Sequence, residues 1–181
     1  MNQIVLTFLI AICVVFSSSC EKATPERIFG EAVLNTNLMS GFAGNGMRYQ
    51  LENPSVKLTL SGGTATMTRK EIIIGQIHSI EDAYETTKRL RESDDNREVL
   101  QASIALYEYV LPVYRKEYHQ LAELYDSNAG KPELDAAYQA IANNYFKGYQ
   151  ERSASLIAAG KPFAKRHGIR VTWDVRTSPS P

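Results

Sequence analysis

The longest hydrophobic pattern in the chain lies in residues 96–126, where apolar and aromatic side chains recur at alternating steps of four and three. This spacing predicts a long amphipathic helix with one continuous buried row. The row is Leu100, Ile104, Tyr107, Leu111, Tyr114, Tyr118, Leu121 and Tyr125. A second row is Val99, Ala102, Leu106, Val110 and Val113. Two rows indicate a helix covered on two sides, so we expect it at the centre of a bundle, with a kink at Pro112.

Helical spacing also appears before and after this segment. Thr68 and Glu71 form a capping-box pattern that opens a helix ending near residues 93–96, where Asp95 is expected to cap the central helix. Pro132 begins a third long helix, which we expect to stop at residues 160–162 because Gly and Pro stand there. A short link at residues 128–130 makes the central and third helices an antiparallel hairpin. A further helix is expected from Pro25 to about Met39.

A period of two replaces the helical period in two places. Residues 56–60 and 65–67 alternate around Ser61, Gly62 and Gly63, a pattern typical of a β-hairpin. Ile169, Val171, Trp173 and Val175 alternate with polar residues and predict a C-terminal strand able to join that hairpin. The predicted fold is therefore mainly α: an antiparallel helical bundle built on a long helical hairpin, with a small β-hairpin and a C-terminal strand.

The N-terminus carries a targeting signal. Residues 4–16 are almost wholly apolar but too short to cross a bilayer, so they are typical of a secretory signal peptide. Three serines follow and then Cys20. This order resembles the lipobox of bacterial lipoproteins, and the resemblance implies cleavage before Cys20 and lipidation of that residue. An ordinary signal peptide with a chance cysteine is the alternative. Cys13 lies in the part that would be removed, so no disulfide is expected.

These signals divide the chain into four parts: a signal peptide at 1–19, a lipid-anchored tether at 20–25, one helical domain at 26–176 and a disordered tail at 177–181. Hydrophobic residues make up 44% of the chain and charged residues 22%, as in an ordinary globular domain. Twenty basic residues balance twenty acidic ones, so no overall charge favours nucleic acid as a partner. The expected location is the cell membrane or outer membrane, with the body facing the periplasm or the exterior.

Candidate chemistry is sparse, and we expect no enzyme and no cofactor. His78 and Glu81 are three residues apart on a predicted helix and could hold a metal ion, although a solvated polar face is the simpler interpretation. The segment from Gly75 to Glu81 is loosely similar to the Gly-x-His-x-Ile-Glu signature of the imelysin family of helical envelope proteins. His119 and Glu123 raise the same metal question on the central helix.

The ten tyrosines favour a different kind of site. Tyr107, Tyr114 and Tyr118 share one face near Pro112 and are either wide core residues or the centre of a partner-binding surface. Two functions follow. The first is a lipid-anchored envelope protein whose helical body binds another, unknown envelope protein without catalysis. The second is a small-ligand or metal binder that uses the kinked bundle or the pair His78 and Glu81.

Overall fold

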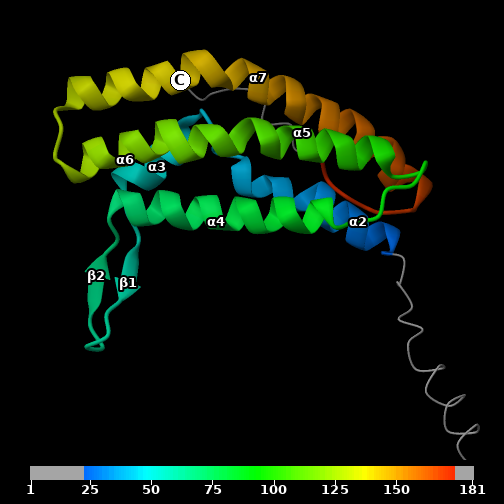
Figure 1. The fold of residues 1–181 in the computed structure, drawn as a ribbon, viewed down its shortest axis with the longest axis horizontal. Helices are drawn as coiled ribbons and strands as arrows, with labels where there is room; N and C mark the ends of the chain where they lie inside the picture. The colour runs from blue at the N-terminus through cyan, green and yellow to red at the C-terminus, as the bar shows by residue number, and fades with distance from the viewer. Residues whose placement is uncertain (1–22, 174–181) are drawn as a thin grey trace, which may run out of the picture.

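The computed structural model describes residues 23–173, which form an elongated helical bundle with one small hairpin (Figure 1). The elements in chain order are α2 (Pro25–Ala32), the 3-10 helix η1 (Leu34–Met39), α3 (Asn45–Glu52), β1 (Val56–Leu58), β2 (Thr64–Thr66), α4 (Arg69–Lys88), α5 (Arg97–Val113), the π-helix η2 (Tyr114–Tyr118), α6 (His119–Asp126) and α7 (Lys131–Arg166). The predicted class, mainly α with a minor hairpin, is confirmed.

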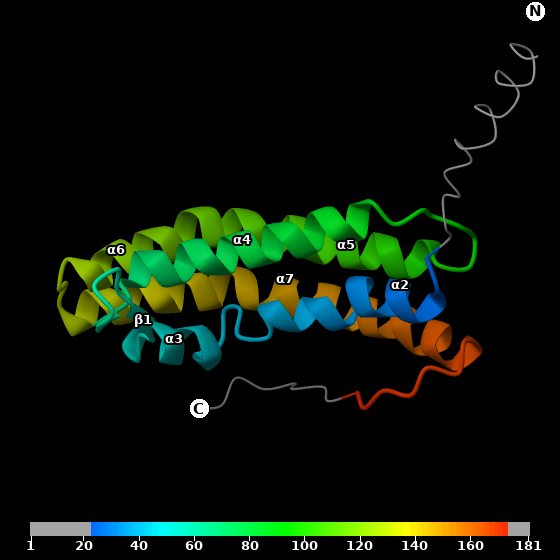
Figure 2. The same cartoon turned by 90° about the horizontal axis from the view of Figure 1, so that it is seen from below.

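One continuous helical rod, made of α5, η2 and α6, holds the bundle together. It packs against α4 on one side and against α7 on another, while α2 and η1 cover a third side. Rods that follow one another in the chain run antiparallel, and the first rod is built from α2, η1 and α3 end to end (Figures 1 and 2). The predicted central position of this helix is therefore correct.

The buried side of the central rod follows the predicted rows closely. Buried residues of the first row are Leu100, Tyr107, Leu111, Tyr114, Tyr118 and Leu121. Buried residues of the second row are Val99, Leu106, Val110 and Val113. Leu111 lies where the two rows meet and is 3% exposed.

Pro112 does not break the central rod, but a π turn follows it. Proline has no N–H, so the Glu108 carbonyl loses its helical donor. The N–H of His119 points to the carbonyl of Tyr114, five residues back, which is the π pattern. The wider turn lets the rings of Tyr114 and Tyr118 stack, with their centroids 4.7 Å apart.

Local capping signals fix several helix ends. Thr68 and Glu71 make the reciprocal capping box at the start of α4, as the sequence predicts. The rod ends at Asp126. Asn128 follows with a left-handed φ of 59°, and the N–H of Ala129 reaches back to the Leu124 carbonyl. Asp95, by contrast, does not cap α5: the N-cap is Asn96, which makes no side-chain capping bond.

Helix α7 is longer than expected, because it runs through both Gly160 and Pro162 to Arg166. The predicted stop at residues 160–162 is wrong. Gly160 is a packing residue: a Cβ there would lie 3.0 Å from the Trp173 ring. Pro162 is exposed, so the carbonyl that loses its partner lies on the solvent side of the helix. The helix ends instead at Arg166, and Gly168 follows with a left-handed φ of 66°.

The N-terminal rod is also more broken than expected. The single helix expected up to Met39 is α2 followed by a 3-10 helix. Ile28, Phe29, Ala32 and Val33 are buried. Helix α3 was missed, because its glycine-rich start resembles a loop. Its buried residues, Met47 and Leu51, are one helical turn apart.

The hairpin of β1 and β2 is confirmed, and its register pairs Val56 with Thr66 and Leu58 with Thr64. The C-terminal strand is not found: residues 169–173 form no strand, and the sheet of the described chain has two strands only. Ile169, Val171 and Trp173 instead pack against the helical core, with the Trp173 ring edge-on to Phe29 at 5.7 Å. Val175 lies outside the described residues.

Among residues 23–173, no helix is both long and apolar enough to span a bilayer. The predicted signal peptide and Cys20 lie outside the described residues, as does the tail from 177 to 181.

Truncating Leu111 tests the central position of the rod. Leu111→Ala should lower the free energy of unfolding by about 2–5 kcal/mol, because it removes a buried side chain and leaves a cavity. Urea denaturation followed by circular dichroism measures the loss. The exposed Gln120→Ala on the same rod should change stability by less than about 0.5 kcal/mol. Equal effects in the two variants would show that the rod is misplaced.

Candidate functional site

The three tyrosines predicted at the centre of a binding surface lie in the core. Tyr107, Tyr114 and Tyr118 are each 0% exposed. The Tyr107 ring lies against Tyr84 of α4, and the Tyr114 and Tyr118 rings lie against Phe42 in the loop before α3. The structure therefore does not present them to a partner, and the interpretation as wide core residues is the correct one.

Two tyrosine hydroxyls hold the loop of residues 41–44 in place. The amide of Ala43 donates to the hydroxyl of Tyr118 at 2.7 Å, and the hydroxyl of Tyr138 on α7 donates to the carbonyl of Gly44. Ala43 has a φ of 51°, which is unfavourable for a residue with a side chain, so these bonds fix a strained backbone. The loop in turn sets where α3 begins.

Phe42 fills the space between the tyrosine rings beneath this loop. Its ring centroid lies 5.1 Å from that of Tyr149, 5.7 Å from Tyr114 and 5.9 Å from Tyr118. Tilted and edge-on ring pairs at such distances are attractive. Phe42 therefore ties the loop to the central rod and to α7 at once.

Tyr114 differs from Tyr118 in its polar end. The hydroxyl of Tyr114 is buried and has no hydrogen-bond partner. Burial raises the pKa of Tyr114 well above its ordinary value, and burial also raises the pKa of Tyr118 despite the bond from Ala43. Burial raises the pKa values of Tyr107 and Tyr138 to about 12.

Helix α3 lies beside α7 (Figure 2). Residues of both helices line an open groove. It has a volume of about 710 Å³, and its walls include Arg48 and Tyr49 from α3 and Tyr138, Asn143 and Phe146 from α7. Tyr49 is 68% exposed, although it is a large aromatic residue. We call this surface the α3–α7 groove. It combines exposed aromatic area with amide groups.

Arg48 fixes the geometry of the groove floor. Its guanidinium lies over the Tyr138 ring, 5.3 Å from the centroid, and bonds to Glu52 at 2.8 Å and Asp135 at 2.6 Å. The bond to Glu52 raises the pKa of Arg48, and bonds from Lys131 and then Arg48 lower the pKa of Asp135. The charges of the groove are thus matched within the protein, which leaves its aromatic surface as the recognition feature.

The sequence pattern did not single out this groove, because its residues come from a missed helix and from the outer side of α7. A signal was present: Met47 and Leu51 mark a buried face that turns Tyr49 outward. An exposed tyrosine opposite a buried row is visible once the helix is recognised.

The metal hypothesis gains no support. His78 is exposed, and the carboxylate of Glu81 bonds to Arg115 at 2.6 Å. Glu123 is shared between Lys70 at 3.1 Å and His119 at 3.5 Å. Within residues 23–173 no three His, Cys, Asp or Glu side chains gather as a metal site would require.

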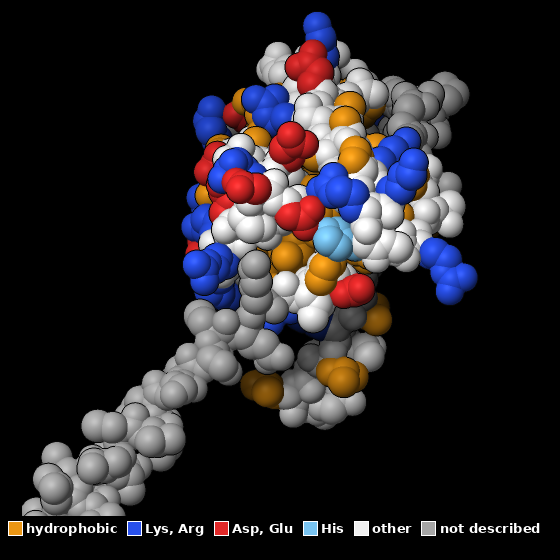
Figure 3. All heavy atoms as spheres, turned by 90° about the vertical axis from the view of Figure 1, so that its right-hand side faces the viewer, with side chains coloured by type: hydrophobic (Ala, Val, Ile, Leu, Met, Phe, Trp, Pro, Cys, Tyr) orange, Lys and Arg blue, Asp and Glu red, His pale blue; other side chains and the backbone are white. Residues whose placement is uncertain are grey.

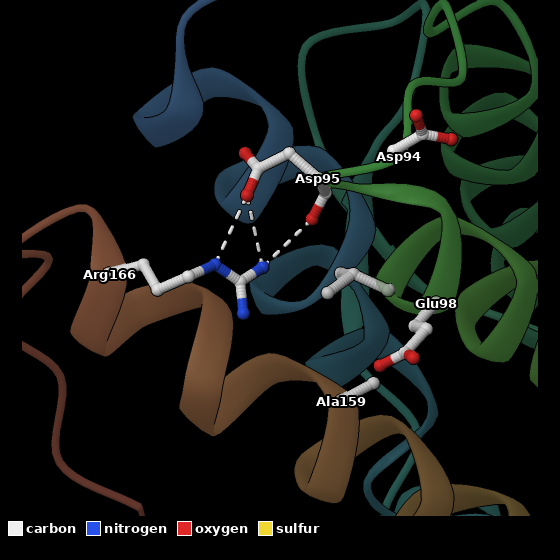
Figure 4. Close-up of a pocket in the computed structure, with 6 residues that line it drawn as sticks. Asp94, Asp95, Glu98, Ala159 and Arg166 are labelled. Atoms are coloured by element: carbon white, nitrogen blue, oxygen red, sulfur yellow. Dashed lines mark hydrogen bonds and ion pairs between the residues drawn. The ribbon is translucent and has the colours of Figure 1, made fainter.

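At the opposite end of the bundle, Asp95 joins the loop before α5 to the end of α7. Its carboxylate accepts from Arg166 at 3.1 Å, and its carbonyl also accepts from Arg166 (Figure 4). The same carboxylate bonds to His167 at 2.7 Å. The bonds from His167 and Arg166 lower the pKa of Asp95. Acidic and basic side chains are interspersed on this end of the molecule (Figure 3). A hollow of about 360 Å³ lies beside Arg166. The charged groups at its edge, Asp95 and Arg166, are bonded to each other and join α7 to the loop before α5.

Comparisons of the chain with protein-family models, with curated proteins and with solved structures each found no match. The function must therefore be argued from the surfaces described above.

The stacked pair Tyr114 and Tyr118 offers a matched test of the bonds that Tyr118 and Tyr138 make to the loop of residues 41–44, which we call the loop clamp. Tyr118→Phe should lower the free energy of unfolding by about 1–3 kcal/mol, because the buried Ala43 amide loses its acceptor. Tyr114→Phe removes a hydroxyl without a partner and should be neutral or stabilising. Chemical denaturation of both variants measures the difference. Equal losses would contradict the clamp.

The raised tyrosine pKa values predict a loss of stability in alkali. Above the ordinary pKa of 10.0 the unfolded chain releases tyrosine protons that the folded chain retains, so unfolding becomes easier as the pH rises. Stability should hold up to about pH 10 and fall between pH 10 and 12, by about 1.4 kcal/mol per pH unit for each such tyrosine. Denaturation curves across this range measure the slope, which should be shallower in Tyr107→Phe. A flat profile would exclude the effect.

Proposed function

We propose that this protein is a lipid-anchored envelope protein that binds another protein, without catalysis, through the α3–α7 groove. The observation that carries the proposal is the exposed Tyr49 beside the Arg48–Tyr138 pair. Tyrosine and arginine are the residues most often responsible for binding energy at protein interfaces. The proposed membrane location rests on the lipobox-like order of residues 17–20.

The groove suits a protein partner more than a small molecule. It is open along its length and its arginine is already neutralised by two carboxylates, so it lacks a charged anchor for a small ligand. Its rigid floor and amide-bearing rim match the pattern of an aromatic centre with a polar rim. We infer a partner surface with an apolar projection that fits between α3 and α7.

The loop clamp supports this role. The bonds from Tyr118 and Tyr138 fix residues 43 and 44, and both residues line the groove. A binding surface that is already ordered loses little conformational entropy when a partner arrives. The buried tyrosines would thus contribute indirectly, by positioning the wall of the groove.

Photo-crosslinking in the protein's own membranes tests the proposal. A photoreactive residue at Tyr49 should yield one defined adduct, and the same residue at Leu34, exposed on η1, should not. With the partner identified, Tyr49→Ala should weaken binding roughly thirtyfold, the effect of about 2 kcal/mol. The melting temperature should not change, because Tyr49 is 68% exposed.

Two results would overturn the proposal separately. Unchanged affinity in Tyr49→Ala would exclude the groove. If Cys20→Ser fractionates and migrates like the wild-type protein, the lipid anchor is wrong, whatever the groove does.

A further inference from the structure

The hairpin of β1 and β2 exposes aliphatic side chains that nothing in the described chain covers. Val56 is 67% exposed, Leu58 81% and Leu60 111%, and the two leucines are the most exposed large hydrophobic residues of the described chain. The strand register pairs Val56 with Thr66 and Leu58 with Thr64, so these four side chains share one face. None of residues 52–72 belongs to the hydrophobic core cluster. The hairpin is thus a projecting ribbon with an uncovered apolar face.

The hairpin is nevertheless held in a defined position. Its base passes into the capping box of α4, and Lys57 forms an ion pair with Glu71 in that box. Its tip is closed by a bond from the Thr59 amide to the Gly63 carbonyl at 2.8 Å, with Gly62 at a φ of 81°. The ion pair ties the ribbon to α4, the tip bond keeps its turn closed, and the ribbon projects away from the bundle (Figure 1).

The direction of the ribbon is informative. The hairpin leaves the bundle on the side opposite α7, and α2 begins on the hairpin's side, at the far end of the bundle (Figure 1). Ala23, the first described residue, is three residues after Cys20. Three residues span at most about 10 Å. A lipid on Cys20 would therefore hold this side of the bundle against the bilayer.

The composition of the hairpin fits the head-group region of a bilayer. Residues 53–67 contain one charged residue, Lys57, and no Asp or Glu. Hydroxyl side chains at Thr59, Ser61, Thr64 and Thr66 surround the aliphatic ones. Shallow insertion buries the leucines while water and head groups still reach the open strand edges, which deeper insertion would not allow.

We propose that the tip of the hairpin, with Leu58 and Leu60, inserts into the same bilayer that holds the lipid anchor. The inference rests on the proposed anchor at Cys20. Attachment at both ends keeps the long axis of the bundle along the membrane, with α7 on the side away from the lipid. A protein strand added to the hairpin edge would also cover the apolar face, but it would not explain why the ribbon points to the side of the anchor.

Depth-dependent fluorescence quenching tests the insertion. The chain has one tryptophan, Trp173, so Trp173→Phe gives a silent background in which Leu60→Trp reports on the hairpin tip. Ala136→Trp, exposed on α7, is the matched control. The lipidated protein is reconstituted in vesicles of phosphatidylethanolamine and phosphatidylglycerol that carry brominated acyl chains.

Insertion predicts a blue-shifted emission for Leu60→Trp and severalfold stronger quenching than for Ala136→Trp. Adding Leu58→Asp should reduce that quenching, whereas adding Leu34→Asp, at an exposed leucine on η1 outside the hairpin, should not. Equal quenching at Leu60 and Ala136 would overturn the inference. A second result would also overturn it: a hairpin that is protected from proteolysis in native membranes while the tryptophan at position 60 is unquenched in these vesicles. In that case a protein, and not lipid, covers the hairpin.

Mass spectrometry of the same sample separates this inference from the anchor. If Cys20 is acylated but the tryptophan at the hairpin tip is not quenched, the lipid anchor is supported and the insertion of the hairpin is excluded. An unmodified Cys20 removes the anchor itself.

Discussion

The hydrogen bonds that two core tyrosines, Tyr118 and Tyr138, make to the loop before α3 are the interaction on which the arrangement of α3 beside α7 depends. A tyrosine supplies a wide apolar ring, but its oxygen needs a partner once it leaves water. Tyr118 and Tyr138 find theirs on the backbone of residues 43 and 44. The loop takes a strained conformation to meet them, and α3 then begins beside α7. The groove is thus a consequence of hydrogen bonding in the core.

The π turn after Pro112 belongs to the same solution. A proline inside a buried helix removes a hydrogen bond, and the chain responds by widening one turn without ending the helix. The wider turn brings Tyr114 and Tyr118 into a stacked pair under Phe42. One of the two hydroxyls is bonded and the other is not, so the packing of the rings outweighs the cost of an unsatisfied oxygen at Tyr114.

Much of the fold was predictable, because its strongest signals are local. The rows of the central rod, the capping box at Thr68 and the hairpin turn each lie within a few residues, and each is confirmed. The errors came from contacts between distant segments. Gly160 does not end a helix but leaves room for the ring of Trp173. The apolar residues that alternate along 169–173 pack on the helices, and this segment pairs with no strand. Tyr107, Tyr114 and Tyr118 proved to be core residues and not a binding surface. Periodicity predicts which rows of a helix are apolar, but it does not show which other elements cover those rows.

Because the hairpin lies outside the core, its sequence is not subject to the packing requirements that constrain the helices. Core positions are constrained by volume and by hydrogen bonding, because each touches several elements. Among the described residues, the Lys57–Glu71 ion pair and the start of α4 join the hairpin to the bundle, and none of residues 52–72 belongs to the core cluster. Its length, its turn and its outward side chains can therefore change without a cost to the packing of the helices. Close variants of this protein should share one body and differ most in what this ribbon contacts.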